Sequence, residues 1–151
     1  MAVFNKLSLG AMQTNRDEKL RLFAGVLLNA GSHSAIPDRV QLIFADMVVR
    51  YEPEHLQYLS FLSDPDRWLP EHGYSPGITM ELGVLMTATI FAGVEDWEIA
   101  FDTMVRELEA DGIIASGFAP SVFVGDVVYS EHRLIWDKGT RFLEYVSGDL
   151  T

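Results

Sequence analysis

Four histidines are the side chains of this sequence best suited to acid–base or metal chemistry. They are His33, His55, His72 and His132, and three of them directly follow a glutamate. Adjacent residues on a helix or strand point in different directions, so a Glu-His pair does not chelate a metal by itself. Neither His-Glu-x-x-His nor His-x-x-x-His spacing occurs. We therefore expect surface or locally hydrogen-bonded histidines and no metal site.

The sequence also gives little support for nucleophilic catalysis or for cofactor binding. The chain has no cysteine, which excludes disulfides and thiolate chemistry. Ser32-His33-Ser34 lacks a Gly-x-Ser-x-Gly elbow around it. The glycines at 73, 77, 83 and 93 fit neither a dinucleotide-binding motif nor a P-loop. These absences predict a protein that is not an enzyme and that holds no cofactor.

Negative charge is concentrated in one segment of the chain. The net charge is −11, from 22 acidic and 11 basic residues. Residues 95–111 combine one base, Arg106, with seven acids, a net charge of −6: Glu95, Asp96, Glu98, Asp102, Glu107, Glu109 and Asp111. Affinity for DNA comes largely from Lys and Arg, so this segment argues against duplex DNA as a partner and favours a basic one.

The elements that must position these residues are mostly helical. Residues 1–14 show no period and are expected to form an N-terminal arm, and apolar spacing predicts a helical pair over 15–51, its first helix at 16–30. Further helices are predicted from Pro53, from Thr79 to about Gly93, and from Asp96, a favourable N-cap. The segment 66–77 is rich in proline and glycine and is expected to be a loop.

After Gly112 the pattern favours β structure. Strands are predicted at Ile113–Phe118 and Arg133–Trp136, and between them a hairpin turning at Gly125-Asp126. A last helix begins at Asp137. The expected fold class is α+β and mainly helical. N-terminal helices pack on a domain over 52–151 that ends in a β-hairpin and a closing helix, and the two parts form one compact unit.

This order of elements resembles the winged-helix superfamily over residues 53–147. The resemblance is carried by Leu108, Gly112, Ile113 and Ile114, after the helix in the recognition position. It is also carried by the run from Ile135 to Gly139 before Phe142-Leu143, where many such domains have Leu-Thr-x-x-Gly and an apolar pair; Trp136 stands at the threonine position.

A second segment resembles one that precedes winged-helix-like tails in uncharacterised bacterial proteins, some of them linked to phage defence. It reads Glu52-Pro53-Glu54-His55-Leu56, followed by Leu59, Leu62 and Asp64-Pro65. This similarity carries no activity with it.

The winged-helix resemblance implies DNA binding through the third helix and the wing. The charge argues for another function, an acidic protein-interaction module that binds a protein partner or itself. A DNA-binding transcriptional regulator and an acidic, nucleic-acid-mimicking inhibitor of the phage type are the alternatives. The expected contacts on the third helix are Glu98, Asp102, Arg106, Glu107 and Glu109. Alternation leaves half of the hairpin side chains outside one core, so apolar contacts are expected at Phe123, Val124, Val127 and Tyr129.

The sequence gives no reason to expect a membrane segment. The longest uncharged apolar stretch, Leu82–Val94, has thirteen residues, whereas a helix needs about twenty to cross a bilayer. Residues 1–12 lack the apolar run of a signal peptide. We expect a cytoplasmic protein.

Overall fold

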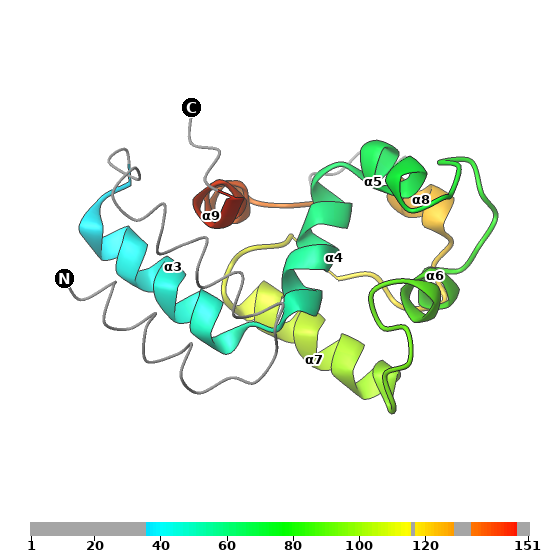
Figure 1. The fold of residues 1–151 in the computed structure, drawn as a ribbon, viewed down its shortest axis with the longest axis horizontal. Coiled ribbons are helices and arrows are strands. Elements are labelled where there is room, and N and C mark those ends of the chain that lie inside the picture. The colour runs from blue at the N-terminus through cyan, green and yellow to red at the C-terminus, as the bar shows by residue number, and fades with distance from the viewer. Residues whose placement is uncertain (1–35, 116, 129–133, 148–151) are drawn as a thin grey trace. The chain divides into compact units, whose positions relative to one another are not determined.

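The protein is mainly helical in the computed structural model, which describes residues 36–115, 117–128 and 134–147 (Figure 1). The described residues contain seven helices: α3 (Asp38–Arg50), α4 (Pro53–Ser63), α5 (Pro65–Glu71), α6 (Leu82–Ala88), α7 (Trp97–Ala110), α8 (Val124–Val128) and α9 (Asp137–Ser147). The chain divides into two compact units, residues 1–53 with 141–151 and residues 54–140. The predicted arm, the predicted helix at 16–30 and Tyr129 lie outside the described residues.

The first unit is held by a cluster of aromatic rings from α3 and α9. Phe44 contacts Phe142 and Tyr145 with ring centroids 5.5 and 5.4 Å apart, and Tyr51 meets Phe142 at 5.7 Å. All four side chains are at most 2% exposed. Edge-on aromatic pairs add to the free energy of burial, so this cluster stabilises the packing of α3 against α9.

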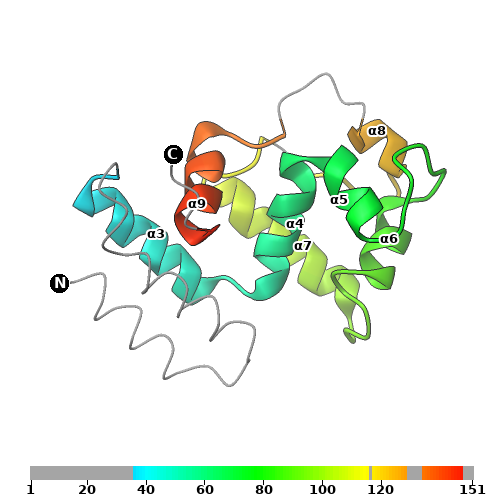
Figure 2. The ribbon, with the colours of Figure 1, turned by 45° about the horizontal axis from the view of Figure 1, so that its top comes forward.

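The second unit is built around α4 and α7, which lie side by side in both views (Figure 2). Tyr58 of α4 meets Phe101 of α7 edge to face, with ring centroids 5.5 Å apart. Phe101 also contacts Phe91, which follows α6, at 6.0 Å. The apolar spacing that predicts α4 and α7 therefore reflects a real buried face on each helix.

Two isolated antiparallel bridges are the β structure of the described residues. Ile114 pairs with Ile135, and Glu81 pairs with Phe123. Around the first pair, Ala115 N–H donates to the Leu134 carbonyl and Trp136 N–H to the Ile113 carbonyl, at 3.0 and 2.9 Å. The two predicted strands, Ile113–Phe118 and Arg133–Trp136, thus pair with each other at a single position.

The predicted hairpin at Gly125-Asp126 is wrong, because Val124–Val128 forms the short helix α8. Helix α8 packs on α5 (Figure 2), and Val124 and Val127 are completely buried. Valine favours strands by fitting a half-buried sheet surface. Here a helical turn buries both valines on the same side, and tertiary packing overrides the local preference.

Two other predictions are wrong in part, the loop at 66–77 and the helix at 79–93. Residues 66–77 contain most of helix α5, which begins at Pro65 because proline suits the first helical position and the Asp64 side chain accepts a hydrogen bond from Arg67 N–H at 3.3 Å. Helix α6 covers Leu82–Ala88, less than the predicted 79–93, since Thr89 leaves helical geometry at φ −127° and ψ −92°.

Gly139 is required by close approach of the backbone. A Cβ atom there would lie 2.7 Å from the Ile113 carbonyl oxygen and would overlap the Ile135 side chain. Gly139 stands in the first turn of α9, directly beside the Ile114–Ile135 bridge. The glycine therefore lets the start of α9 sit against the paired segments.

Replacing Gly139 with alanine should destabilise the protein by about 2 kcal/mol, because the added methyl group meets backbone that cannot move aside. Alanine is otherwise the better helix former, by about 1 kcal/mol. Chemical denaturation measures the change, and Thr140→Ala at the exposed neighbouring position is the control. A Gly139→Ala protein as stable as the parent would contradict this packing.

Alkaline pH should unfold the protein through its buried tyrosines. Burial raises the pKa of Tyr145 to about 12 and raises that of Tyr58 still further. Below the ordinary tyrosine pKa of about 10, both phenols are neutral in the folded and in the unfolded protein, and the fold has its full stability. As the pH rises from there towards the folded pKa, the unfolded protein loses its phenol protons first, so the free energy of unfolding falls. The double variant Tyr58→Phe, Tyr145→Phe should therefore unfold at higher pH than the parent, followed by circular dichroism. An unchanged alkaline midpoint would rule out this linkage.

Candidate functional site

Helix α7 separates an apolar face from an acidic face, as predicted. Phe101, Met104, Val105 and Leu108 are buried, while Glu98, Asp102 and Glu109 are exposed. These carboxylates are four and then seven residues apart, which places them on one face of a helix. We call the three residues the acidic face of α7.

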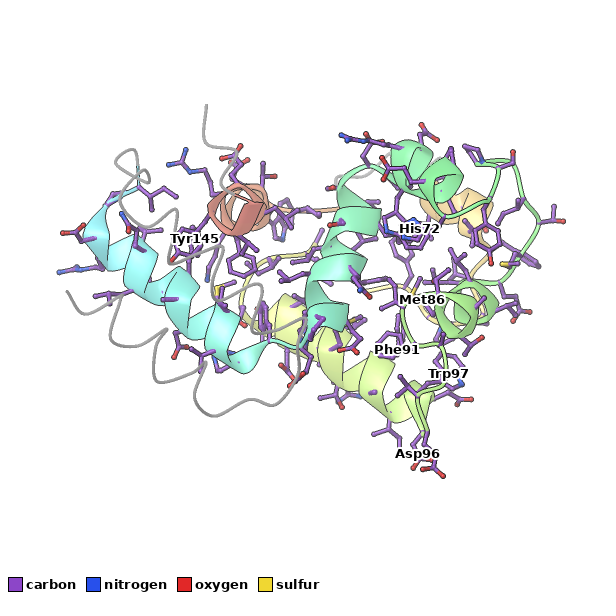
Figure 3. All side chains as sticks on the ribbon, in the orientation of Figure 1. His72, Met86, Phe91, Asp96, Trp97 and Tyr145 are labelled. Atoms are coloured by element: carbon purple, nitrogen blue, oxygen red, sulfur yellow. The ribbon has the colours of Figure 1, made fainter. Side chains whose placement is uncertain are left out.

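The start of α7 differs from its prediction in one respect. Asp96 occupies the N-cap position, but its backbone is left-handed at φ 53° and its side chain makes no capping hydrogen bond. Aspartate tolerates this conformation better than most residues. Asp96 thus turns the chain into the helix and does not cap it (Figure 3).

Arg106 is the one base in α7, and it pairs within the helix. Its Nε lies 3.0 Å from the Asp102 carboxylate, and the two side chains are 79% and 63% exposed. An exposed pair of this kind contributes little to stability. It does neutralise part of the charge at Asp102, which leaves Glu98 and Glu109 as the stronger acidic positions.

Glu107 has a structural role that the sequence does not reveal. Its carboxylate lies 3.1 Å from Nε2 of His55, which is 6% exposed on α4. The side chain of Glu107 is 37% exposed. The pair ties α4 to α7, so Glu107 and His55 belong to the scaffold more than to an open surface.

Two of the four apolar contacts predicted at residues 123–129 are wrong, because Val124 and Val127 do not reach solvent. Val124 and Val127 are 0% exposed, because α8 turns both side chains inward. Phe123 remains available at 51% exposure. Tyr129 lies outside the described residues.

Three exposed apolar side chains of the second unit were not predicted. Val84 on α6 is 51% exposed, Ile99 on α7 is 68% exposed, and Trp136 before α9 is 46% exposed. Val84 lies in the uncharged apolar stretch Leu82–Val94, and Ile99 lies on the helix whose exposed side was expected to be acidic. Their exposure depends on which side of each helix faces the core, and here the core takes Leu82, Leu85 and Met86 from α6.

A groove of about 420 Å³ lies beside the start of α7. Its lining comes from α6, from α7 and from the segment before α8: Glu81, Gly83, Val84, Thr87, Trp97, Glu98, Pro120 and Ser121. We call it the Trp97 groove. Trp97 falls within the regular apolar period of α7, but the sequence gives no sign that residues 81–87 and 120–121 converge on it.

Gly83 allows the wall of this groove to form. A Cβ atom on Gly83 would lie 3.0 Å both from Cη2 of Trp97 and from Cβ of Pro120. Gly83 N–H also donates to the Pro120 carbonyl at 2.9 Å. The absence of a side chain therefore brings Trp97, Pro120 and α6 into contact, and Figure 3 shows Trp97 beside α6.

A second depression of about 350 Å³ surrounds His72. The imidazole stacks on Trp68 with ring centroids 3.7 Å apart, and its Nδ1 lies 2.8 Å from the Trp68 carbonyl oxygen. His72 is thus oriented by local contacts, and His55 is bonded to Glu107. The prediction of surface or locally hydrogen-bonded histidines is confirmed for His72, whereas His55 is buried and bonds to a residue of another helix.

Comparisons with known proteins do not assign a function. Neither a family model, nor a curated protein, nor a solved structure matches the chain. Among the residues that the structure describes, no group of three or more histidine or carboxylate side chains could hold a metal ion. Of the helices described, none has the length and apolar character needed to cross a membrane.

Gly83→Ala should destabilise the protein by about 1 kcal/mol, because the clash with Trp97 and Pro120 outweighs the gain in helix propensity. The control is Gly125→Ala in α8, where no atom lies within 4 Å of the new Cβ. That change should stabilise the protein by up to about 1 kcal/mol. Thermal unfolding distinguishes the two variants. Equal stabilisation by both would show that Gly83 is not in tight contact.

Proposed function

We propose that residues 54–140 form a non-enzymatic interaction domain that binds a basic segment of a partner protein. The acidic face of α7 carries this proposal, because its three carboxylates are exposed on one side of a single rigid helix. Within the described residues, the side chains of Glu98 and Glu109 form neither a hydrogen bond nor an ion pair. Uncompensated charge of one sign attracts a partner of the other sign and speeds its association.

Two other partners fit this surface less well. Duplex DNA needs basic side chains, and the single base of α7 is already paired with Asp102. A second copy of the chain would bring two acidic faces together, and like charges in contact disfavour association. A nucleic-acid-mimicking inhibitor is a special case of the same proposal, in which the partner's basic segment is its nucleic-acid site.

We further propose that this domain is a winged-helix-like scaffold. What supports the proposal is the order of α4, α6 and α7 followed by the antiparallel pairing of Ile114 with Ile135. In such a scaffold α7 takes the recognition position, and the exposed side of that helix is the usual binding surface. A cytoplasmic location is proposed as well, with which a cysteine-free sequence is compatible.

An octa-arginine peptide and a duplex of mixed sequence are suitable probes for this function. In titrations followed by amide NMR, the peptide should shift the resonances of α7 and bind more weakly as salt is added, since exposed charges are screened. The duplex should cause no shift. The triple variant Glu98→Gln, Asp102→Asn, Glu109→Gln should bind the peptide about tenfold more weakly, which corresponds to about 1.4 kcal/mol.

The matched control removes the same three charges away from α7. Asp38, Asp66 and Glu71 are exposed on α3 and α5, and their amide variants should keep most of the affinity. If both triple variants weaken binding equally, the effect comes from net charge alone and the acidic face of α7 is not a binding surface.

A further inference from the structure

We propose that the Trp97 groove receives one arginine side chain of the basic segment. The inference rests on the proposed function and adds to it a specific anchor for the partner. The groove lies at the start of α7 and shares only Glu98 with the acidic face, because its other carboxylate, Glu81, comes from the N-cap of α6. Its position, its apolar wall and its two carboxylates each favour an arginine.

The wall of the groove suits the flat, partly apolar arginine side chain. Trp97 and Pro120 pack together across Gly83, and Val84 adds an aliphatic surface that is 51% exposed. Arginine buries its methylene groups on such surfaces while its head group stays hydrated. A guanidinium also stacks on an indole face, where the ring quadrupole attracts the cation.

The charge of the groove comes from Glu81 and Glu98. Glu81 is the N-cap residue of α6, and its side chain makes no capping hydrogen bond. Within the part of the chain that the structure describes, neither glutamate pairs with another side chain. The lining includes no lysine, arginine or histidine. Both carboxylates are therefore available to accept hydrogen bonds from a guanidinium, which offers five donors.

Other occupants fit the groove less well. An anion would meet two carboxylates, and a neutral apolar group would cover them without pairing them, which costs free energy. A lysine ammonium satisfies the charge, but it is compact and strongly hydrated and gains less from the tryptophan face. The volume of about 420 Å³ is at the small end of ligand pockets, as expected for one side chain with its flanking backbone.

Three short peptides test the proposal directly. Each has a Gly-Ser background with blocked ends and one central residue, which is arginine, lysine or citrulline. Citrulline has the shape of arginine without its charge. In amide NMR titrations with the full chain, the arginine peptide should shift the Trp97 indole N–H and the Gly83 amide in a saturable way. Its affinity should exceed that of the lysine peptide by about threefold or more, and the citrulline peptide should not bind. A lysine peptide that binds as tightly as the arginine peptide would overturn the proposal.

Glu81→Gln is the decisive variant, because Glu81 is exposed and lies outside α7. It should weaken binding of the arginine peptide about fivefold, whereas Asp66→Asn, which removes the same charge from α5, should leave it unchanged. Trp97→Phe should weaken binding as well; if that variant does not fold, Glu81→Gln and the peptide series decide alone.

The outcomes separate this inference from the proposed function. The double variant Asp102→Asn, Glu109→Gln changes the acidic face of α7 but leaves the groove lining intact. If it weakens octa-arginine binding while the arginine and citrulline peptides behave alike, the groove is not an arginine site and the interaction domain stands. If octa-arginine binding is also indifferent to the acidic face, both proposals fail.

Discussion

Burial of one side of α7 fixes which of its side chains reach solvent. Phe101, Met104 and Leu108 are inside the second unit, and a helix that buries these positions must turn Glu98, Asp102 and Glu109 outward. The contacts of Phe101 with Tyr58 and of Glu107 with His55 hold α7 against α4. Rotation of α7 would break the aromatic packing and bring carboxylates into the core, where an unpaired charge is strongly unfavourable. The acidic surface is thus a consequence of the core.

Helices with a regular apolar period could be predicted from the sequence. The expected helices at Pro53, Asp96 and Asp137 begin within a residue of α4, α7 and α9. In these segments local preference and tertiary burial agree. Helices α5 and α8 could not be predicted in the same way. Helix α5 contains two prolines, a composition more typical of a loop. The valines of α8 favour a strand by local preference, and they form a helix because Val124 and Val127 are buried against neighbours distant in sequence.

The candidate site was only partly predictable for the same reason. The carboxylates of α7 follow from spacing within one helix. The pairing of Glu107 with His55 joins residues 52 positions apart, and the Trp97 groove combines three separate segments. Spacing within a single helix holds no information on such pairs. A helical glycine at position 83 was the one local hint, because an interior glycine weakens a helix and is often kept for close packing.

The two isolated bridges have a consequence for how the second unit opens. Each consists of one residue pair, yet the first joins positions 114 and 135 and the second joins positions 81 and 123. Closing such long loops costs more conformational entropy than two hydrogen bonds return. The bridges therefore persist because Ile114, Ile135 and Val124 are buried beside them. The backbone amides of both bridges should then exchange with solvent together with the core of this unit, as part of one cooperative opening and not as independently fraying strand ends.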